Sequence, residues 1–168
     1  MPKIIENPEI RLMEEARRQI EEFGYAAMTI RSVAKGCGIG IGTVYNYFPS
    51  KDALVAGYML GDWKACVAAI DECSAQANSP ETVVRFIYQQ LLAFAIRHRN
   101  VFQDEAAATA FSGSFSQNHT LLRSQIAAPL RKFCSDGFSA EFIAESLLTW
   151  TMAGKDFDVI YGQLQKLF

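Results

Sequence analysis

The chain has 168 residues, of which 50% are hydrophobic and 20% are charged, and its formal net charge is -2 at pH 7. This composition is typical of a globular protein and excludes disordered and collagen-like chains. We find no apolar run near the roughly 20 residues of a membrane-spanning helix and no apolar core of a secretory signal. We therefore expect a cytoplasmic protein with no membrane partner, in which any nucleic-acid binding depends on the local placement of charge.

Cysteine and histidine spacing predicts neither a metal site nor a cofactor. The four cysteines form no CxxC pair and the two histidines lie far apart, whereas a structural zinc site needs about four ligands in closely spaced pairs. Cys66 and Cys73 lie on one predicted helix, where they can share a face. We interpret them as small buried apolar groups, and a thiol-based redox sensor is the alternative.

Apolar residues recur at helical spacing along the chain, and no sustained alternation of period two indicates a strand. The sequence therefore predicts an all-α fold, with helices over about 8–23, 30–35, 41–48, 51–77, 80–98, 101–111, 119–134, 140–153 and 157–167. Residues 112–118 are the most loop-like stretch. The expected N-caps are Asn7, Thr29, Ser50, Ser79, Asn100 and Ser139. Met13, Ala16, Ile20 and Phe23 give the first helix its apolar stripe.

These helices divide into two predicted parts, and Pro49 followed by Ser50 marks the boundary. Residues 1–48 hold three short helices with a small core. Residues 49–168 form a longer bundle of about six helices. The helix from residue 51 is apolar on nearly all sides, which is typical of a helix in the middle of a bundle.

The segment 28–54 has the pattern of a helix-turn-helix, a common DNA-binding motif. Two short helices flank the turn 36–40, which contains three glycines in five residues. No acidic residue lies between Gly24 and Lys51, and the basic residues there are Arg31, Lys35 and Lys51. The local charge is thus positive although the chain as a whole is slightly negative.

The second helix of this motif has one apolar side and one small, polar side. Val44 and Phe48 are four residues apart and face the core with Ile39. The residues predicted to lie outside are Gly42, Thr43, Asn46 and Tyr47. Glycine and threonine let a backbone approach a DNA groove closely, and hydroxyl and amide groups bond phosphates or base edges.

The string TVYNYFPSKDAL at residues 43–54 resembles the DNA-binding domain of the TetR family of bacterial transcription regulators. The upstream strings Phe23-Gly24-Tyr25, Met28-Thr29-Ile30 and Val33-Ala34 match in the same order, so the resemblance covers residues 10–60. It implies an N-terminal helix-turn-helix DNA-binding domain and a C-terminal effector-binding and dimerisation domain. The function implied is a repressor that binds a palindromic operator in double-stranded DNA as a homodimer and is released by a small-molecule effector.

The resemblance also implies roles for single residues of this motif. Thr29 caps the second helix and bonds a DNA phosphate, and Thr43, Tyr45, Tyr47 and Lys51 contact the DNA backbone. Ile41, Gly42 and Asn46 approach base edges, and Arg31 adds positive charge to the same surface. An alternative for Tyr45, and less so for Tyr47, is an aromatic residue of the domain core.

Three residues depart from the family pattern. Gly40 replaces a serine or threonine cap, Ile41 is apolar where a polar base reader is common, and Gly36 lowers the helix propensity of the second helix. The recognition helix has no arginine, which is the usual reader of guanine. We therefore expect specificity to depend mainly on backbone contacts and DNA shape.

The last two helices are the expected dimer surface, with packing on the core as the alternative. The apolar residues in question are Phe142, Ile143, Leu147, Trp150, Phe157, Ile160, Tyr161, Leu164 and Phe168. The effector is expected among the middle helices, where the candidate lining residues are Tyr58, Trp63, Phe86, Tyr88, Phe94, Phe102, Phe111, Phe115 and Trp150. Ordinary core packing is the alternative for each aromatic ring. The run 97–99, Arg-His-Arg, is expected at a solvated helix end, with anion binding as the alternative.

Two other classes of protein compete with a regulator. An enzyme is disfavoured because the chain offers no recognisable nucleophile, base and orienting group, and the acidic pairs at 104–105 and at Asp156 and Asp158 have no histidine at helical spacing. A helical interaction module that has lost DNA binding is the other alternative. It differs from the regulator in that substitution of Thr29, Tyr47 or Lys51 leaves the binding of its target unchanged.

Overall fold

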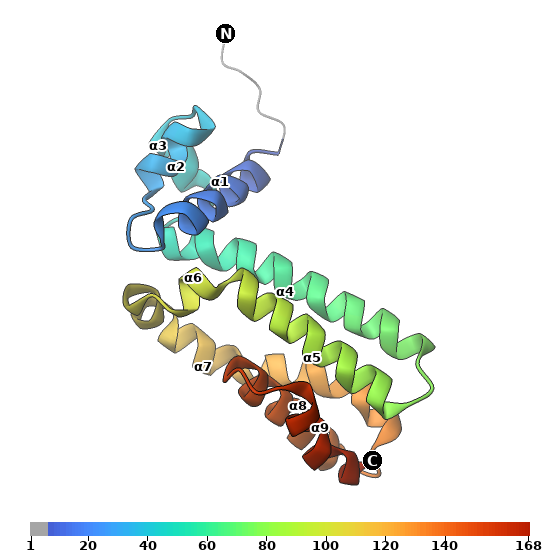
Figure 1. Cartoon of the computed structure of the whole chain (residues 1–168). Helices are drawn as coiled ribbons and strands as arrows, with labels where there is room; N and C mark the ends of the chain where they lie inside the picture. The colour runs from blue at the N-terminus through green and yellow to red at the C-terminus, as the bar shows by residue number, and fades with distance from the viewer. Residues whose placement is uncertain (1–6) are drawn as a thin grey trace. The chain divides into compact units, whose positions relative to one another are not determined.

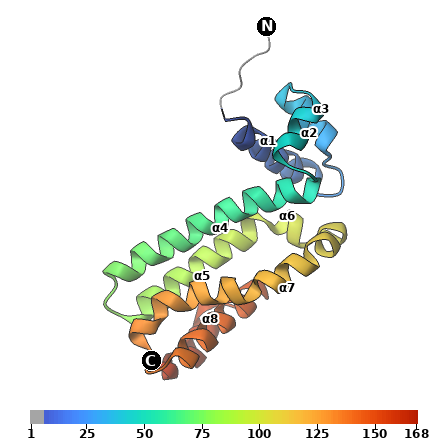
Figure 2. The same ribbon diagram turned by 180° about the vertical axis from the view of Figure 1, so that it is seen from behind.

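The computed structural model describes the backbone of residues 7–168 and the side chains of that range except residues 112–117. The described part is all-α, as predicted, and contains no strand. Its helices, drawn in Figures 1 and 2, are α1 (Pro8–Phe23), α2 (Ile30–Cys37), α3 (Ile41–Tyr47), α4 (Lys51–Gln76), α5 (Pro80–Arg97), α6 (Arg99–Phe102), α7 (Glu105–Ala127), α8 (Gly137–Met152) and α9 (Phe157–Leu164). Two short 3₁₀ helices, η1 (Ala128–Phe133) and η2 (Gln165–Leu167), follow α7 and α9.

The chain forms two compact units. We call Met1–Asp62 with His98–Ser112 the head unit, and Trp63–Arg97 with Gly113–Phe168 the bundle unit. The helix α4 contributes its first part to the head unit and the rest to the bundle unit. The predicted domain boundary after residue 48 stays a prediction about the chain, and the head unit is larger than that first domain.

The core of the head unit is built from one face of each short helix. Val44 of α3 and Phe48 after it are buried and Ile39 packs against them, so the predicted inner face of this helix is confirmed. The buried residues of α2 are Ile30, Val33, Ala34 and Cys37. The stripe predicted for α1 is partly wrong. Phe23 is 58% exposed and Met13 is only partly buried, and the buried positions are Leu12, Ala16, Gln19 and Ile20. The buried stripe of α1 includes the polar Gln19, so the spacing of apolar residues alone predicted the wrong face.

Hydroxyl side chains cap the N-termini of three helices, as predicted. Thr29 accepts a hydrogen bond from the Ser32 N–H at 3.0 Å, Ser50 from Ala53 at 3.0 Å, and Ser79 from Thr82 at 3.2 Å. Each bond satisfies a first-turn N–H group that has no partner within its helix. These three predictions are therefore confirmed.

Of the other three predicted caps, Asn7 has the expected position without the expected bond, and Asn100 and Ser139 are wrong. Asn7 has a left-handed backbone with φ 50° and its side chain makes no cap bond. Asn100 lies within α6, and its amide donates to the carbonyls of Ile20 and Glu21 at the end of α1. Asp136 caps α8 in place of Ser139, because its carboxylate accepts from the Ser139 N–H at 2.7 Å. Ser139 is thus a first-turn residue of α8.

The predicted loop at 112–118 is also wrong, because α7 is continuous over Glu105–Ala127. Serine, glycine and asparagine lower helix propensity, but this penalty is small beside the packing that a long helix gains at both ends. The predicted continuation of that helix to residue 134 is wrong as well. Pro129 follows its last turn, and the chain continues as the 3₁₀ helix η1.

The bundle unit has a core of aliphatic side chains from α4, α5, α7, η1, α8 and α9. By length and composition α4 is apolar enough to cross a membrane, with 33% of its most apolar window buried. Its buried residues Leu54 and Val55 belong to the head core, and Cys66 and Ile70 to the bundle core. The buried positions lie along one side of α4, and Leu60 is 52% exposed, so the expectation of a helix enclosed in the middle of a bundle is wrong.

Burial also bears on the cysteines of α4. Cys66 is buried, and the loss of solvation raises the pKa of its thiol to about 11. A thiol with that pKa holds very little reactive thiolate at neutral pH. The structure therefore favours the interpretation of Cys66 as a small core group over that of a redox sensor.

Candidate nucleic-acid interface

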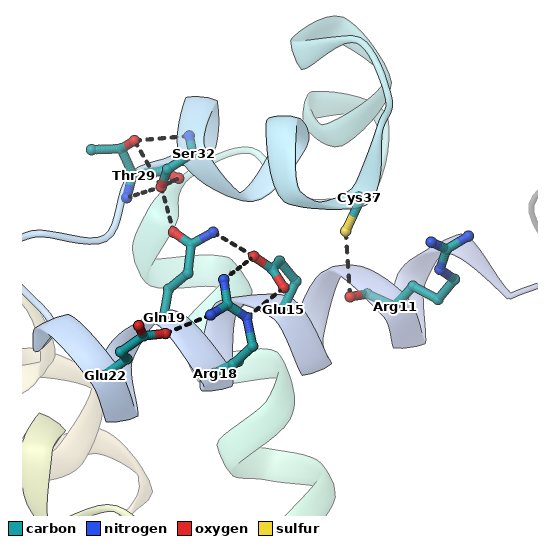
Figure 3. A network of polar contacts seen from close by, with 8 residues as sticks. All are labelled: Arg11, Glu15, Arg18, Gln19, Glu22, Thr29, Ser32 and Cys37. Atoms are coloured by element: carbon teal, nitrogen blue, oxygen red, sulfur yellow. Dashed lines mark hydrogen bonds and ion pairs between the residues drawn. The ribbon is translucent and has the colours of Figure 1, made fainter.

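The start of α2 presents a complete capping box. The Ser32 N–H donates to Thr29 Oγ1, and the Thr29 N–H donates to Ser32 Oγ, both at 3.0 Å (Figure 3). Thr29 is exposed, and the N–H groups of the next two residues lie in the first turn of the helix. First-turn N–H groups and the positive end of the helix dipole attract anions. The exposed side chain of Arg31 lies in the same turn.

The helix α3 exposes nearly all of its surface. Of its seven residues only Val44 is buried. The exposed residues include every predicted DNA contact on this helix, namely Ile41, Gly42, Thr43, Tyr45, Asn46 and Tyr47. Tyr45 is 51% exposed and Tyr47 is 44% exposed, so the alternative that these tyrosines are core residues is excluded.

The turn between α2 and α3 is shorter than the sequence predicts. Gly36 and Cys37 continue α2, and Gly38 ends it with φ 68°, in the left-handed region that favours glycine. Gly36 has a different reason for being glycine. A Cβ there would lie 2.1 Å from Glu15 Oε1, so a larger residue would have to displace the Glu15 side chain.

Lys51, at the start of α4, is half-buried rather than free on the surface. Its ammonium group donates to the carbonyl of Tyr25 and lies 4.0 Å from the centre of the Tyr25 ring. Burial lowers the pKa of Lys51, although the nearby carboxylates of Asp104 and Asp52 oppose this effect. The Tyr25 hydroxyl donates to Asp52, and burial together with that carboxylate raises the pKa of Tyr25. Lys51 therefore fixes the loop after α1, and its contact with DNA stays a prediction.

Sequence reasoning missed the polar network behind this surface. Gln19 of α1 is buried, its amide N–H donates to Glu15 at 2.7 Å, and its carbonyl accepts from the Ser32 hydroxyl at 2.5 Å (Figure 3). Arg18 donates to both oxygens of Glu15, and this bond lowers the pKa of the Glu15 carboxyl. A glutamine within an otherwise apolar stripe is the signal that points to such a network.

The predicted effector residues are divided between the two units of the chain, and their role stays a prediction. Tyr58, Phe102 and Phe111 belong to the head unit, and Trp63, Phe86, Tyr88, Phe94 and Trp150 belong to the bundle unit. Trp63 is buried, packs edge-on against Phe94 and donates to Gln125 at 2.8 Å. Trp150 is 49% exposed. The side chain of Phe115 lies outside the described residues.

The run of basic residues at the end of α5 is not uniformly solvated. His98 is 2% exposed, and its Nε2 lies 2.9 Å from Asp62 Oδ2. The same carboxylate oxygen accepts from Arg17 at 2.8 Å, and the Tyr58 ring stacks on the imidazole. The expectation of a solvated helix end is therefore wrong for His98, because an acidic and an aromatic neighbour accommodate it inside the head unit.

Some residues predicted for a dimer surface lie on the buried faces of α8 and α9, and others lie on their exposed faces. Five of them are buried in the bundle core, namely Ile143, Leu147, Phe157, Ile160 and Leu164. For these five the alternative of core packing is correct, because they lie on the inner side of each helix. Phe142 and Trp150 are each 49% exposed, and the exposed apolar surface also includes Phe138 and Val159.

Comparison with known proteins gives matches to one family. The model of bacterial regulatory proteins of the tetR family matches residues 12–58. The transcriptional regulator UidR of Escherichia coli K12 is 32% identical over 62 residues, which cover 37% of this chain and 32% of UidR. The transcriptional repressor KstR2 of Mycobacterium tuberculosis H37Rv is 32% identical over 109 residues, which cover 62% of this chain and 54% of KstR2. The match thus spans about a third to a half of these relatives.

The fold of the whole chain agrees with this match. The transcriptional repressor FadR of Thermus thermophilus superposes with a TM-score of 0.65 and 21% identity, over 95% of this chain and 92% of FadR. The residues that carry the sequence resemblance lie within the matched segment. Some of them, such as Thr43 and Tyr47, are exposed on α3, and others, such as Val44, belong to the core of the head unit. Residues 12–58 therefore match the tetR family of bacterial regulatory proteins, and the chain shares the fold of FadR over nearly its whole length.

Proposed function

We propose that this protein is a DNA-binding transcriptional repressor that is released from its operator by a small molecule. One observation supports the proposal most strongly. Apart from the apolar Ile41, the exposed residues of α3 and of the first turn of α2 carry hydroxyl, amide or basic groups or are glycine, and no acidic residue lies between Gly24 and Lys51. Such a surface is suited to phosphates and groove edges. The relative KstR2 is a transcriptional repressor, which supports repression rather than activation.

In this proposal α3 is the recognition helix and lies in the major groove. Thr29, Arg31, Thr43, Tyr45 and Tyr47 contact the DNA backbone. Ile41, Gly42 and Asn46 approach the base edges. Lys51 supports this surface through the loop after α1. Because Asn46 is the single amide of α3 and the helix has no arginine, few base-specific hydrogen bonds are expected, and DNA shape contributes to specificity.

The protein acts as a homodimer through α8 and α9 in this proposal. Phe138, Phe142 and Trp150 of α8 and Val159 of α9 are large, exposed apolar side chains. Burial of such aromatic groups between two copies is typical of stable dimers. A two-fold dimer matches a palindromic operator whose half-sites lie one helical turn, or about 34–36 Å, apart.

The effector in this proposal is an apolar or aromatic molecule that binds in the bundle unit. Trp63 and Phe94 pack together there, and Gln125 offers a polar group beside the indole. Two proteins of similar fold have been solved with such ligands, FadR of Thermus thermophilus with lauroyl-CoA and RolR with resorcinol. A ligand releases DNA only to the extent that it prefers the released conformation. The protein needs no metal or cofactor for this function and is expected in the cytoplasm.

A mobility-shift assay with the DNA that flanks the gene tests the proposal. Salt-sensitive binding with a submicromolar Kd at about 100 mM salt is expected. The variant Arg31→Ala is expected to lower the slope of log K against log salt by about one, and Lys64→Ala, an exposed lysine of α4, is the control. Absence of binding would favour an interaction module that has lost DNA binding, and equal salt slopes for all three proteins would show that Arg31 contacts no phosphate.

A further inference from the structure

Gln19 is a polar side chain in the middle of the buried face of α1. It is 5% exposed, and Leu12, Ala16 and Ile20 of the same face are fully or almost fully buried. A buried amide without hydrogen bonds destabilises the fold, so its partners decide why it is tolerated there. Both ends of the amide have a partner. The nitrogen donates to Glu15 and the oxygen accepts from the Ser32 hydroxyl (Figure 3).

Ser32 has an unusual place in the capping box of α2. This third helical position usually holds glutamate or glutamine, whose longer side chain reaches back to the cap residue. Ser32 reaches the Thr29 N–H at 3.0 Å with a short hydroxyl that also has other rotamers available. Its single proton has two acceptors within reach, the Gln19 carbonyl oxygen at 2.5 Å and the Thr29 carbonyl oxygen at 2.8 Å. When the proton is donated to Gln19, the lone pairs of Ser32 face the N–H and hydroxyl groups of Thr29 at 3.0 and 3.1 Å.

The other end of the Gln19 amide is anchored firmly. Glu15 accepts from Gln19 at 2.7 Å and from Arg18 at 2.8 and 3.0 Å. The Glu15 side chain also fills the space over Gly36, where no Cβ would fit. A chain of bonds therefore runs from α1 to the first turn of α2, and each member restricts the next.

We propose that Gln19 is a positioning residue for the DNA-backbone contact at the start of α2. It holds the Ser32 hydroxyl in the rotamer that completes the cap, and the cap fixes the directions of Thr29 and of the first-turn N–H groups. This inference rests on the proposed DNA-binding function. It assigns to a buried residue of α1 an effect on phosphate binding that its own position, away from the surface, does not suggest.

The test is a double-mutant cycle that uses fluorescence anisotropy with a fluorescein-labelled duplex of random sequence. Gln19→Met keeps the side-chain length and removes both polar groups. It is expected to weaken binding about three- to tenfold in the otherwise unchanged protein. In the Thr29→Val background, where the capping hydroxyl is already absent, the same change is expected to alter the affinity by less than about twofold.

Ile20→Val is the matched control, because it changes the neighbouring buried residue of α1 without touching the network. Its affinity should equal that of the unchanged protein at a temperature well below both melting temperatures. A loss of equal factor in both Thr29 backgrounds would show that Gln19 only stabilises the head unit, and no loss in either would exclude any positioning role. If the unchanged protein binds no duplex at all, the proposed function itself is wrong.

Discussion

The head unit and the bundle unit expose opposite kinds of surface on their helices. The seven-residue helix α3 buries only Val44 and presents hydroxyl, amide and glycine groups together with one apolar residue, Ile41. The helix α8 buries Ile143 and Leu147 on one side and presents Phe142 and Trp150 on the other. A polar face without acids suits an anionic partner, and a face of aromatic rings suits an apolar one. The difference supports the proposal that the head unit recognises DNA and that the bundle unit associates with a second copy.

The largest expected effect is on the free energy of unfolding, and it distinguishes the buried side of α8 from the exposed side. Leu147 is fully buried, so Leu147→Ala leaves a cavity in the bundle core and should lower the free energy of unfolding by about 2–5 kcal/mol. Phe142→Ala, on the exposed side, should have a much smaller effect on the stability of one subunit. Urea denaturation of both variants at low protein concentration measures these changes. Equal losses of stability would contradict the assignment of Phe142 to an exposed side of α8.

The exposed side of α8 should control association. Phe142→Ser combined with Trp150→Ser removes two aromatic rings from the proposed interface and is expected to weaken the dimer by about 2 kcal/mol or more. Sedimentation equilibrium measures the change. Ile96→Ser is the control, because Ile96 is a large apolar residue of the bundle unit that is 59% exposed on α5. A dimer that tolerates the double variant would place the interface elsewhere.

Two glycines of the head unit should respond to alanine in opposite directions. Gly38 has φ 68°, so Gly38→Ala should destabilise the protein by about 1 kcal/mol. Gly42 lies within α3 with open space around it, so Gly42→Ala should stabilise the helix by up to about 1 kcal/mol. If α3 enters the major groove, Gly42→Ala should nevertheless weaken DNA binding.

Thermal unfolding and anisotropy on the same samples separate these effects. A Gly42→Ala variant that gains stability and keeps its full DNA affinity would contradict the close approach of α3 to the groove floor.

The smallest expected effect concerns the Glu15 carboxyl. Its pKa is lowered in the folded state, chiefly by the bond from Arg18. A lowered folded pKa contributes stability above the unfolded pKa, and this contribution is lost as the pH falls through the folded value. Glu15→Gln should therefore be less stable than the unchanged protein at pH 7, and the two melting temperatures should converge in acid. A constant difference across the acidic range would show that the charge of Glu15 has no role.

The head unit could be predicted well because its signals are local. Thr29, Ser50 and the turn at Gly38 act within a few residues of themselves, and Val44 with Phe48 defines an inner face over one helical turn. In the bundle unit, the period of the apolar residues predicted the helices but not which of their faces are buried. It found α8 but placed Phe142 and Leu147 together, because a helix that is apolar on several sides has no unique inner face until its neighbours are known.

The sequence by itself determined the all-α class, the helix-turn-helix and the surface residues of α3, because capping, turn formation and helical period depend on neighbours along the chain. Only the tertiary structure decided that Gln19 is bonded to Ser32, that His98 is buried beside Asp62, and that α7 continues through its polar stretch. Each of these depends on residues far apart in the sequence, since burial and pairing are set by packing and not by local propensity.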